Sequence, residues 1–175
     1  MKRLVLLIGS LILFSYLLTA QDYYRVRKHG RISTGLNEAA AVPYEDGIVY
    51  MTESTSVGAS SPTDDEGRRL FTIFLYKEGM GQKKPFCDNL VSQRHEGPAS
   101  FTADFKTMVF SQQRPAMSGR GTYPLGLYFA KIEDGQCLSI REYEHNNDLN
   151  WFFSPSISAD GNTLFFASND PDGEG

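Results

Sequence analysis

The stretch Phe153–Asn169 reads FSPSISADGNTLFFASN and decides how this chain is interpreted. It predicts a β-hairpin in which a short strand at Ser156–Ser158 enters a tight turn. Asp160 and Gly161 suit that turn because they tolerate positive φ. The strand that follows, Leu164–Ala167, is nearly continuous in apolar residues, which predicts that both of its faces are covered.

The same pattern recurs earlier in the chain. It appears as GPASFTADFKTMVFSQQ at Gly97–Gln113 and, in a degenerate form with one deletion in the turn, as EAAAVPYEDGIVYMTES at Glu38–Ser54. Asp104 aligns with Asp160, but Phe105 stands where the glycine would be. The turn of the middle copy must therefore differ or carry strain.

Further apolar runs separate these hairpins. We expect third strands at Leu70–Tyr76 and Leu125–Ile132, and fourth strands at Phe86–Val91 and Cys137–Tyr143. Four short antiparallel strands in each repeat are typical of a β-propeller blade, whose faces need neighbouring blades on both sides. The predicted fold class is all-β.

Pro155–Asn169 closely resembles the WD40-like propeller repeat of bacterial exported proteins, which include TolB and Bacteroidetes outer-membrane proteins of the OmpA family. Gly97–Phe101 is similar to the opening strand of that repeat, whereas Phe105 departs from its glycine. The resemblance extends loosely from Asn37 to the end of the chain. It implies a rigid, non-enzymatic interaction platform at the cell envelope.

The predicted organisation has three parts. Residues 1–20 form a signal peptide, residues 21–36 a lead-in segment, and residues 37–175 an incomplete β-propeller with blades at about 37–94, 95–149 and 150–175, the last truncated. About two and a half blades cannot close a ring of about four to eight. We therefore expect this chain to be the N-terminal fragment of a longer protein.

The first part of the chain, MKRLVLLIGSLILFSYLLTA, has the features of a secretory signal. Lys2 and Arg3 precede an apolar run that extends from Leu4 to Leu18. A membrane anchor is the alternative, but this run is shorter than the roughly 20 residues that cross a bilayer. Cleavage after Ala20 predicts export, and the resemblance to the WD40-like repeat proteins implies the periplasm or outer membrane of a Gram-negative cell as the destination.

Composition and charge exclude several classes. Of the 175 residues, 41% are hydrophobic and 13% aromatic, enough to build a core and to argue against wholesale disorder. Without Lys2 and Arg3, 15 basic residues face 21 acidic ones, a formal charge of −6 that makes nucleic acid a poor partner. The densest basic group, Arg25, Arg27, Lys28 and Arg31, is too short to change this.

The acidic residues are predicted to hold turns. Asp104 and Asp160 recur at one place in the repeat, where an Asp side chain accepts backbone hydrogen bonds. Asp170 and Asp172 have the alternation of a calcium loop, but Asp-Pro and Asp-Gly also form ordinary β-turns, which we favour. The sequence predicts no catalytic, cofactor-binding or metal-binding residues. The histidines His29, His95 and His145 show no pairing that would join them in one site.

The remaining aromatic and sulfur residues are given structural roles. Trp151, Phe152 and Phe153 are expected to fill the core between blades, with a surface binding role for Trp151 as the alternative. Cys87 and Cys137 would lie on the outer strands of successive blades, beyond the roughly 7 Å that a disulfide allows between Cα atoms. We expect them to be unpaired.

The sequence therefore predicts an exported β-propeller without cofactor or metal. The resemblance implies that it is a scaffold without enzymatic activity, whose partners are envelope proteins or peptidoglycan-associated machinery. The alternative comes from another class of protein. Similar propellers form the N-terminal, substrate-gating domain of prolyl-oligopeptidase-like serine peptidases, and a catalytic domain following Gly175 would favour that interpretation.

Overall fold

The computed structural model describes residues 25–55, 62–90, 92–115 and 124–173. Every regular element in these ranges is a strand, and no helix in them is long and apolar enough to cross a membrane. The all-β class predicted from the sequence is therefore confirmed. The predicted signal peptide, residues 1–20, lies outside the described residues.

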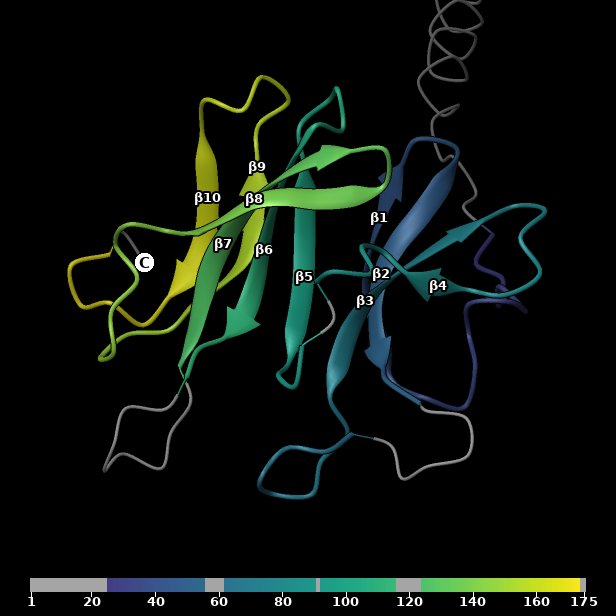
Figure 1. The fold of residues 1–175 in the computed structure, drawn as a ribbon, viewed down its shortest axis with the longest axis horizontal. Coiled ribbons are helices and arrows are strands. Elements are labelled where there is room, and N and C mark those ends of the chain that lie inside the picture. The colour runs from purple at the N-terminus through teal and green to yellow at the C-terminus, as the bar shows by residue number, and fades with distance from the viewer. Residues whose placement is uncertain (1–24, 56–61, 91, 116–123, 174–175) are drawn as a thin grey trace, which may run out of the picture.

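The strands form three antiparallel sheets of four, four and two strands, which lie side by side in chain order (Figure 1). Within each sheet, neighbouring strands are also neighbours in sequence. The first sheet contains β1 (Glu38–Tyr44), β2 (Gly47–Glu53), β3 (Phe71–Lys77) and β4 (Lys84–Pro85); the second contains β5 (Glu96–Phe101), β6 (Thr107–Gln113), β7 (Leu125–Glu133) and β8 (Gln136–Glu142); the third contains β9 (Phe152–Ile157) and β10 (Leu164–Ser168).

The two clear copies of the repeat form β5–β6 and β9–β10, the first hairpins of the second and third sheets. Asp104 and Asp160 hold the turns in the same way. In each, Oδ1 accepts a hydrogen bond from the hydroxyl two residues earlier, at 2.7 Å for Asp104 and 2.6 Å for Asp160, and from the backbone N–H two residues later, at 3.1 Å. These bonds, the hydroxyl bond foremost, lower the pKa of both carboxyls, that of Asp160 to about 2. The predicted turn role is confirmed.

Phe105 adopts the conformation of the glycine that it replaces. Its φ is 57°, against 75° for Gly161, so the two turns are alike and Phe105 carries the strain of the left-handed region. Its ring packs edge-on against that of Tyr44, with 5.0 Å between centroids. Burial of an aromatic side chain thus offsets a backbone conformation that disfavours it.

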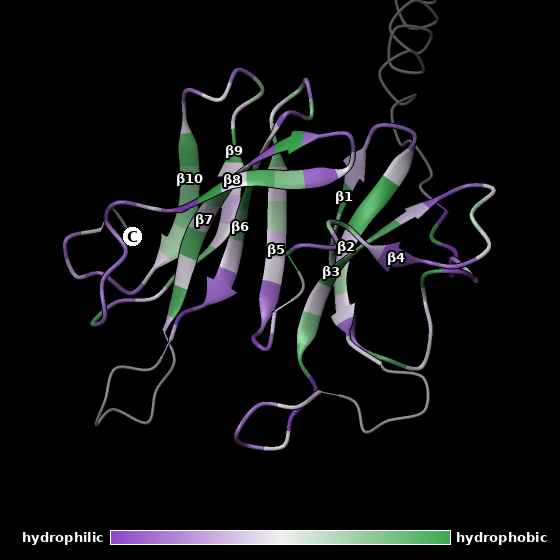
Figure 2. Ribbon diagram, in the orientation of Figure 1, coloured by the Kyte–Doolittle hydropathy of each residue, from purple (hydrophilic) through white to green (hydrophobic). Residues whose placement is uncertain are grey.

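The main hydrophobic core lies between the first and second sheets. Val49 from β2 is 1% exposed, and Met108 and Phe110 from β6 are fully buried. Tyr44 and Phe86 pack edge-on within this core, 4.8 Å apart. Figure 2 shows that hydrophobic residues are concentrated on the strands and hydrophilic residues in the connections.

The fourth strand of the first sheet is displaced from its predicted position. A strand was expected at Phe86–Val91, but β4 is the residue pair Lys84–Pro85 and the chain turns at Phe86. Val91 lies outside the described residues. Phe86, Cys87 and Leu90 are 4%, 1% and 5% exposed, so the chain leaves the sheet edge to bury these side chains in the core.

This displacement also overturns the prediction that the cysteines are unpaired. Cys87 and Cys137 form a disulfide with their Cα atoms 5.6 Å apart. Asn89 strengthens the same contact, because its side chain donates to the carbonyl of Cys137 at 2.6 Å and accepts from its N–H at 3.3 Å. Cys87 is not on an outer strand but on a turn that lies against β8 of the next sheet.

The third sheet is covered on one face only. Phe152 and Ile157 of β9 are buried towards the second sheet, whereas Phe165 of β10 is 69% exposed. The expectation that Leu164–Ala167 is covered on both faces is therefore wrong for the described structure. No described sheet packs against the outer face of β9–β10.

Candidate functional site

A cavity of about 640 Å³ opens at one end of the strands, where β2 and β6 end and β3, β5, β7 and β9 begin. This is the lower end of the sheets in Figure 1. All three sheets, or the segments that enter them, contribute to its wall. The lining residues are Asn37, Met51, Glu53, Arg68, Arg69, Phe71, His95, Glu96, Gly97, Gln113, Leu125 and Trp151.

The cavity has an apolar part and a polar rim. Met51, Phe71, Leu125 and Trp151 are its large apolar lining residues. Gly97 lets the first two sheets approach here, because a Cβ on it would stand 3.0 Å from the Cβ of Met51. Strand residues of both sheets, Met51 and Gly97 among them, thus contribute to the wall of the cavity.

Trp151 belongs to this cavity and not to the core. Its side chain is 43% exposed, so the core-filling role predicted for it is wrong and the alternative, a surface aromatic, describes its position. The prediction holds for Phe152, which is 4% exposed and packs against Tyr143 and Phe166. Phe153 is 36% exposed and does not fill the core either.

The carboxylate of Asp64 fixes the part of the cavity wall that is formed by the segment before β3. Asp64 accepts hydrogen bonds from the backbone and from Nε of Arg68, at 2.8 and 2.7 Å. Burial opposes ionisation, but the bonds from Arg68, His95 and Glu66 outweigh it and hold the pKa of Asp64 well below its usual range. Asp64 is therefore an anchoring anion.

His95 is the one histidine that lines the cavity, and both of its ring nitrogens are occupied. Nδ1 accepts from the N–H of Phe71 at 3.3 Å, which leaves Nε2 to donate to Asp64 at 3.2 Å. His95 thus ties the start of β5 to the first sheet and has no nitrogen left for acid–base chemistry. His29 and His145 lie elsewhere, against Tyr76 and Tyr143.

Two arginines provide the accessible charge at the rim. The Arg68 side chain is 62% exposed and is held by Asp64. The Arg69 side chain is 48% exposed, and its NH1 lies 3.5 Å from Oε2 of Glu53, which is 16% exposed and accepts a bond from Asn37. Glu53 is less exposed than the two guanidinium groups. Arg68 and Arg69 therefore present N–H donors to the solvent at the mouth of the cavity.

Glu96 places a buried carboxyl in the cavity wall. It is 1% exposed, Oε1 accepts from the N–H of Ser92 at 2.7 Å, and Oε2 has no partner among the described residues. Burial raises the pKa of Glu96 to about 7, and the hydrogen bond from Ser92 only partly opposes this. The carboxyl of Glu96 therefore gains or loses its proton close to neutral pH.

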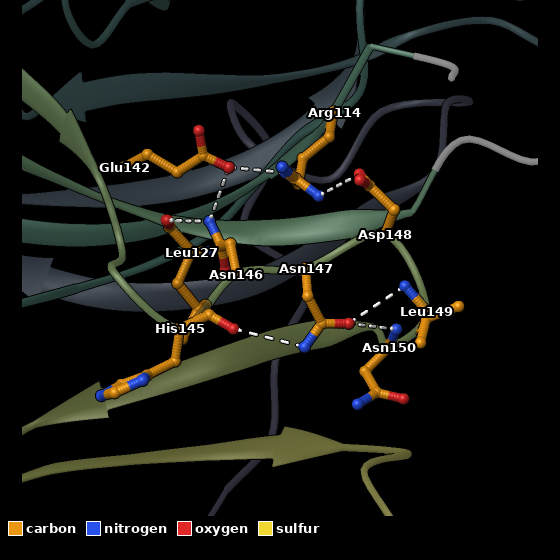
Figure 3. Close-up of polar contacts among 9 residues, drawn as sticks. All are labelled: Arg114, Leu127, Glu142, His145, Asn146, Asn147, Asp148, Leu149 and Asn150. Carbon is orange, nitrogen blue, oxygen red and sulfur yellow. Dashed lines mark hydrogen bonds and ion pairs between the residues drawn. The ribbon is translucent and has the colours of Figure 1, made fainter. Parts of the chain in front are cut away.

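A polar network fixes the link between β8 and β9, which carries the cavity tryptophan (Figure 3). Arg114 bridges Glu142 and Asp148, with its Nε and NH1 at 2.6 and 2.8 Å from the two carboxylates. The side chain of Asn146 pairs with the backbone of Leu127, accepting at 3.0 Å and donating at 2.8 Å. The link is therefore bound to β7 and to the end of β6.

The loop after β10 holds the other side of this link. The N–H of Trp151 donates to Oδ1 of Asn169 at 2.6 Å, and Asn150 donates to Asp170 at 2.8 Å. Asp170 also accepts from the N–H of Asp172 at 3.1 Å, as in an ordinary turn. In the described residues no group of three or more His, Cys, Asp or Glu side chains is arranged to hold a metal ion.

Comparisons with known proteins leave the chain without an assigned family: no family model, no curated protein and no solved structure matches it. The proposals that follow therefore rest on the residues of this chain and their arrangement.

Proposed function

We propose that the chain contains an incomplete β-propeller of about two and a half blades and acts as a partner-binding scaffold in a Gram-negative cell envelope. Its partners would be envelope proteins or peptidoglycan-associated machinery, as the resemblance to the WD40-like repeat implies. The observation that carries the proposal is the cavity of about 640 Å³, to which all three sheets contribute and in which Trp151 is 43% exposed.

The repeated packing of the sheets supports a propeller. The alignment of the repeats places Val49, Val109 and Phe165 at one position in β2, β6 and β10. Val49 faces the second sheet and is 1% exposed, and Val109 is fully buried on the side of the third sheet. Because one position is covered by the following sheet twice, the exposed Phe165 marks the surface on which a further blade would pack.

The construction of the cavity supports binding. Its apolar residues lie at strand ends, and its polar residues are tied by side-chain bonds such as those of Asp64 and His95. A site held in this way loses little conformational entropy when a partner binds. Binding residues are commonly presented in this manner at the ends of rigid β-scaffolds.

Two features support export. The segment Met1–Ala20 has the pattern of a signal peptide. The Cys87–Cys137 disulfide is the form that two thiols adopt in an oxidising compartment such as the periplasm, and it is rare in the cytosol.

The test is site-specific crosslinking in a Gram-negative host that expresses the full chain. The photoreactive residue p-benzoylphenylalanine replaces Trp151 in one variant and Arg141, on the outer strand β8, in the control. We expect a periplasmic protein that begins at Gln21, and crosslinks to envelope proteins from position 151 only. Identical products from both positions, or none from either, would refute the binding role. Unprocessed protein in the cytosol would refute the location.

A further inference from the structure

We propose that the cavity binds an extended peptide segment in which a bulky apolar side chain is adjacent to a carboxylate. This inference rests on the proposed partner-binding role and names the chemistry of the segment that is bound. It depends on the apolar and cationic parts of the same cavity, which lie at the ends of neighbouring strands.

The apolar part selects the side chain. Phe71 and Trp151 contribute aromatic surface, Met51 contributes a thioether that adapts to irregular shapes, and Leu125 completes the wall. A volume of about 640 Å³ falls within the roughly 300 to 1,000 Å³ of typical ligand sites. A Phe, Leu or Met side chain of a partner would remove apolar surface from water on both sides of the contact.

The cationic part selects the carboxylate. Of the two rim arginines, Arg68 is committed to Asp64 and Glu66, at 2.7 and 3.1 Å. Arg69 makes one contact within the described structure, the 3.5 Å approach to Glu53, so most of its five N–H donors have no partner among the described residues. A planar guanidinium with free donors is suited to bidentate recognition of a carboxylate.

Glu53 sets the strength of this recognition. Its Oε1 is bound by the side-chain amide of Asn37, and its Oε2 is the group that a partner's carboxylate would displace from Arg69. An acidic ligand thus competes with Glu53 for one guanidinium. Removal of the Glu53 charge should strengthen binding, whereas removal of the Arg69 charge should weaken it.

The chain contains a single tryptophan, Trp151, so its fluorescence reports directly on the cavity. The probe is acetyl-Gly-Phe-Glu-Gly-amide, titrated into the full chain while the emission of Trp151 is followed. Two control peptides carry Gln in place of Glu or Ser in place of Phe. We expect a saturable shift with the first peptide and at least tenfold weaker binding of both controls, because a charge-assisted hydrogen bond and a buried aromatic ring each exceed that factor.

Three protein variants complete the experiment. Arg69→Gln should weaken the acidic peptide at least tenfold and leave the Gln peptide unchanged, whereas Glu53→Gln should bind the acidic peptide several-fold more tightly. Arg141→Gln, on the outer strand β8, is the matched control and should bind as the wild type does. If Arg69→Gln fails to fold, the Glu53→Gln result still decides the case.

Two outcomes would overturn the inference. Equal affinity for the Glu and Gln peptides would show that the cavity does not select a carboxylate. No response of Trp151 to any peptide, in a protein that crosslinks to a partner from position 151, would show that the partner has other chemistry while the proposed function stands. If crosslinking and peptide binding both fail, the proposed function fails as well.

Discussion

The two junctions between sheets are built differently, although the repeats that form them are alike. The first and second sheets share the main core, with Phe110 fully buried, and are joined by the Cys87–Cys137 disulfide. The second and third sheets are joined by apolar contacts of β9 and by backbone bonds to the hydroxyls of Ser111 and Ser100, at 3.2 and 3.0 Å. One junction has a covalent link, and the other is held by apolar contacts and hydrogen bonds alone among the described residues.

The outer faces of the first and third sheets show the same asymmetry. On the first sheet, Ile32 of the lead-in segment is 9% exposed and packs with Tyr50 and Tyr76. On the third sheet, Phe165 remains 69% exposed. A sheet of this type needs both faces covered, and the difference shows that a short turn segment can supply the cover that a neighbouring sheet would otherwise give.

The largest expected effect concerns burial at these two places. Phe110→Ala should lower the free energy of unfolding by about 3 to 5 kcal/mol, because it opens a cavity in the main core. Phe165→Ala is the matched control on an exposed position and should change it by no more than about 0.5 kcal/mol. Urea unfolding of both variants measures the difference. A comparable loss for Phe165→Ala would mean that the outer face is covered in solution.

The disulfide should rank second. Replacing both cysteines by alanine removes a crosslink between residues 50 apart in sequence, which the loop-entropy relation values at about 4 kcal/mol and which typically costs about 2 to 4 kcal/mol. Hydrogen exchange should accelerate mainly in β4 and β8, while β9–β10 changes less. Mass spectrometry of the wild type should show a gain of two hydrogens on reduction, and no gain would contradict the pairing.

The sequence was sufficient for the local structure that its turns encode. Asp104 and Asp160 predicted two hairpins correctly, because the polar side chain that holds each turn is bound within a few residues of its own backbone. The strands Leu125–Ile132 and Cys137–Tyr143 were also located within about a residue or two, because their apolar patterns end at turn residues.

What the sequence left undetermined depends on contacts between sheets. The turn at Phe86 that brings Cys87 to Cys137 is set by burial in a neighbouring sheet, which no local pattern records. The candidate site was missed for the same reason. One signal was present. In antiparallel sheets, odd-numbered strands begin and even-numbered strands end at the same end of the sheet, so Met51, Phe71 and Leu125 could have been predicted to lie together there.

Glu96 shows how the two junctions differ at one aligned position. It begins β5 as Phe152 begins β9, and the repeat offset places the two in register. Phe152 joins an aromatic cluster with Tyr143 and Phe166, whereas Glu96 buries a carboxyl at 1% exposure with Oε2 unpartnered among the described residues. The first junction therefore contains a buried titratable carboxyl at a position where the second has an aromatic ring.

The buried carboxyl of Glu96 should make the free energy of unfolding depend on pH. Burial raises the pKa of Glu96 from 4.5 to about 7. Below pH 4.5 the carboxyl is neutral in both the folded and the unfolded state, so its ionisation does not lower the free energy of unfolding. Between these values the unfolded chain releases the proton while the folded chain keeps it. The free energy of unfolding falls over this range, and the loss is complete above pH 7 at about 3 to 4 kcal/mol at most.

Glu96→Gln isolates this contribution. The amide oxygen can still accept the bond from Ser92, but the side chain no longer titrates. Urea unfolding between pH 4.5 and 8 should therefore show a decline in wild-type stability that is steeper than that of the variant, with the gap opening towards pH 7. Parallel curves would mean that the carboxyl is hydrated or paired in solution, and the first junction would then have no more pH dependence than the second.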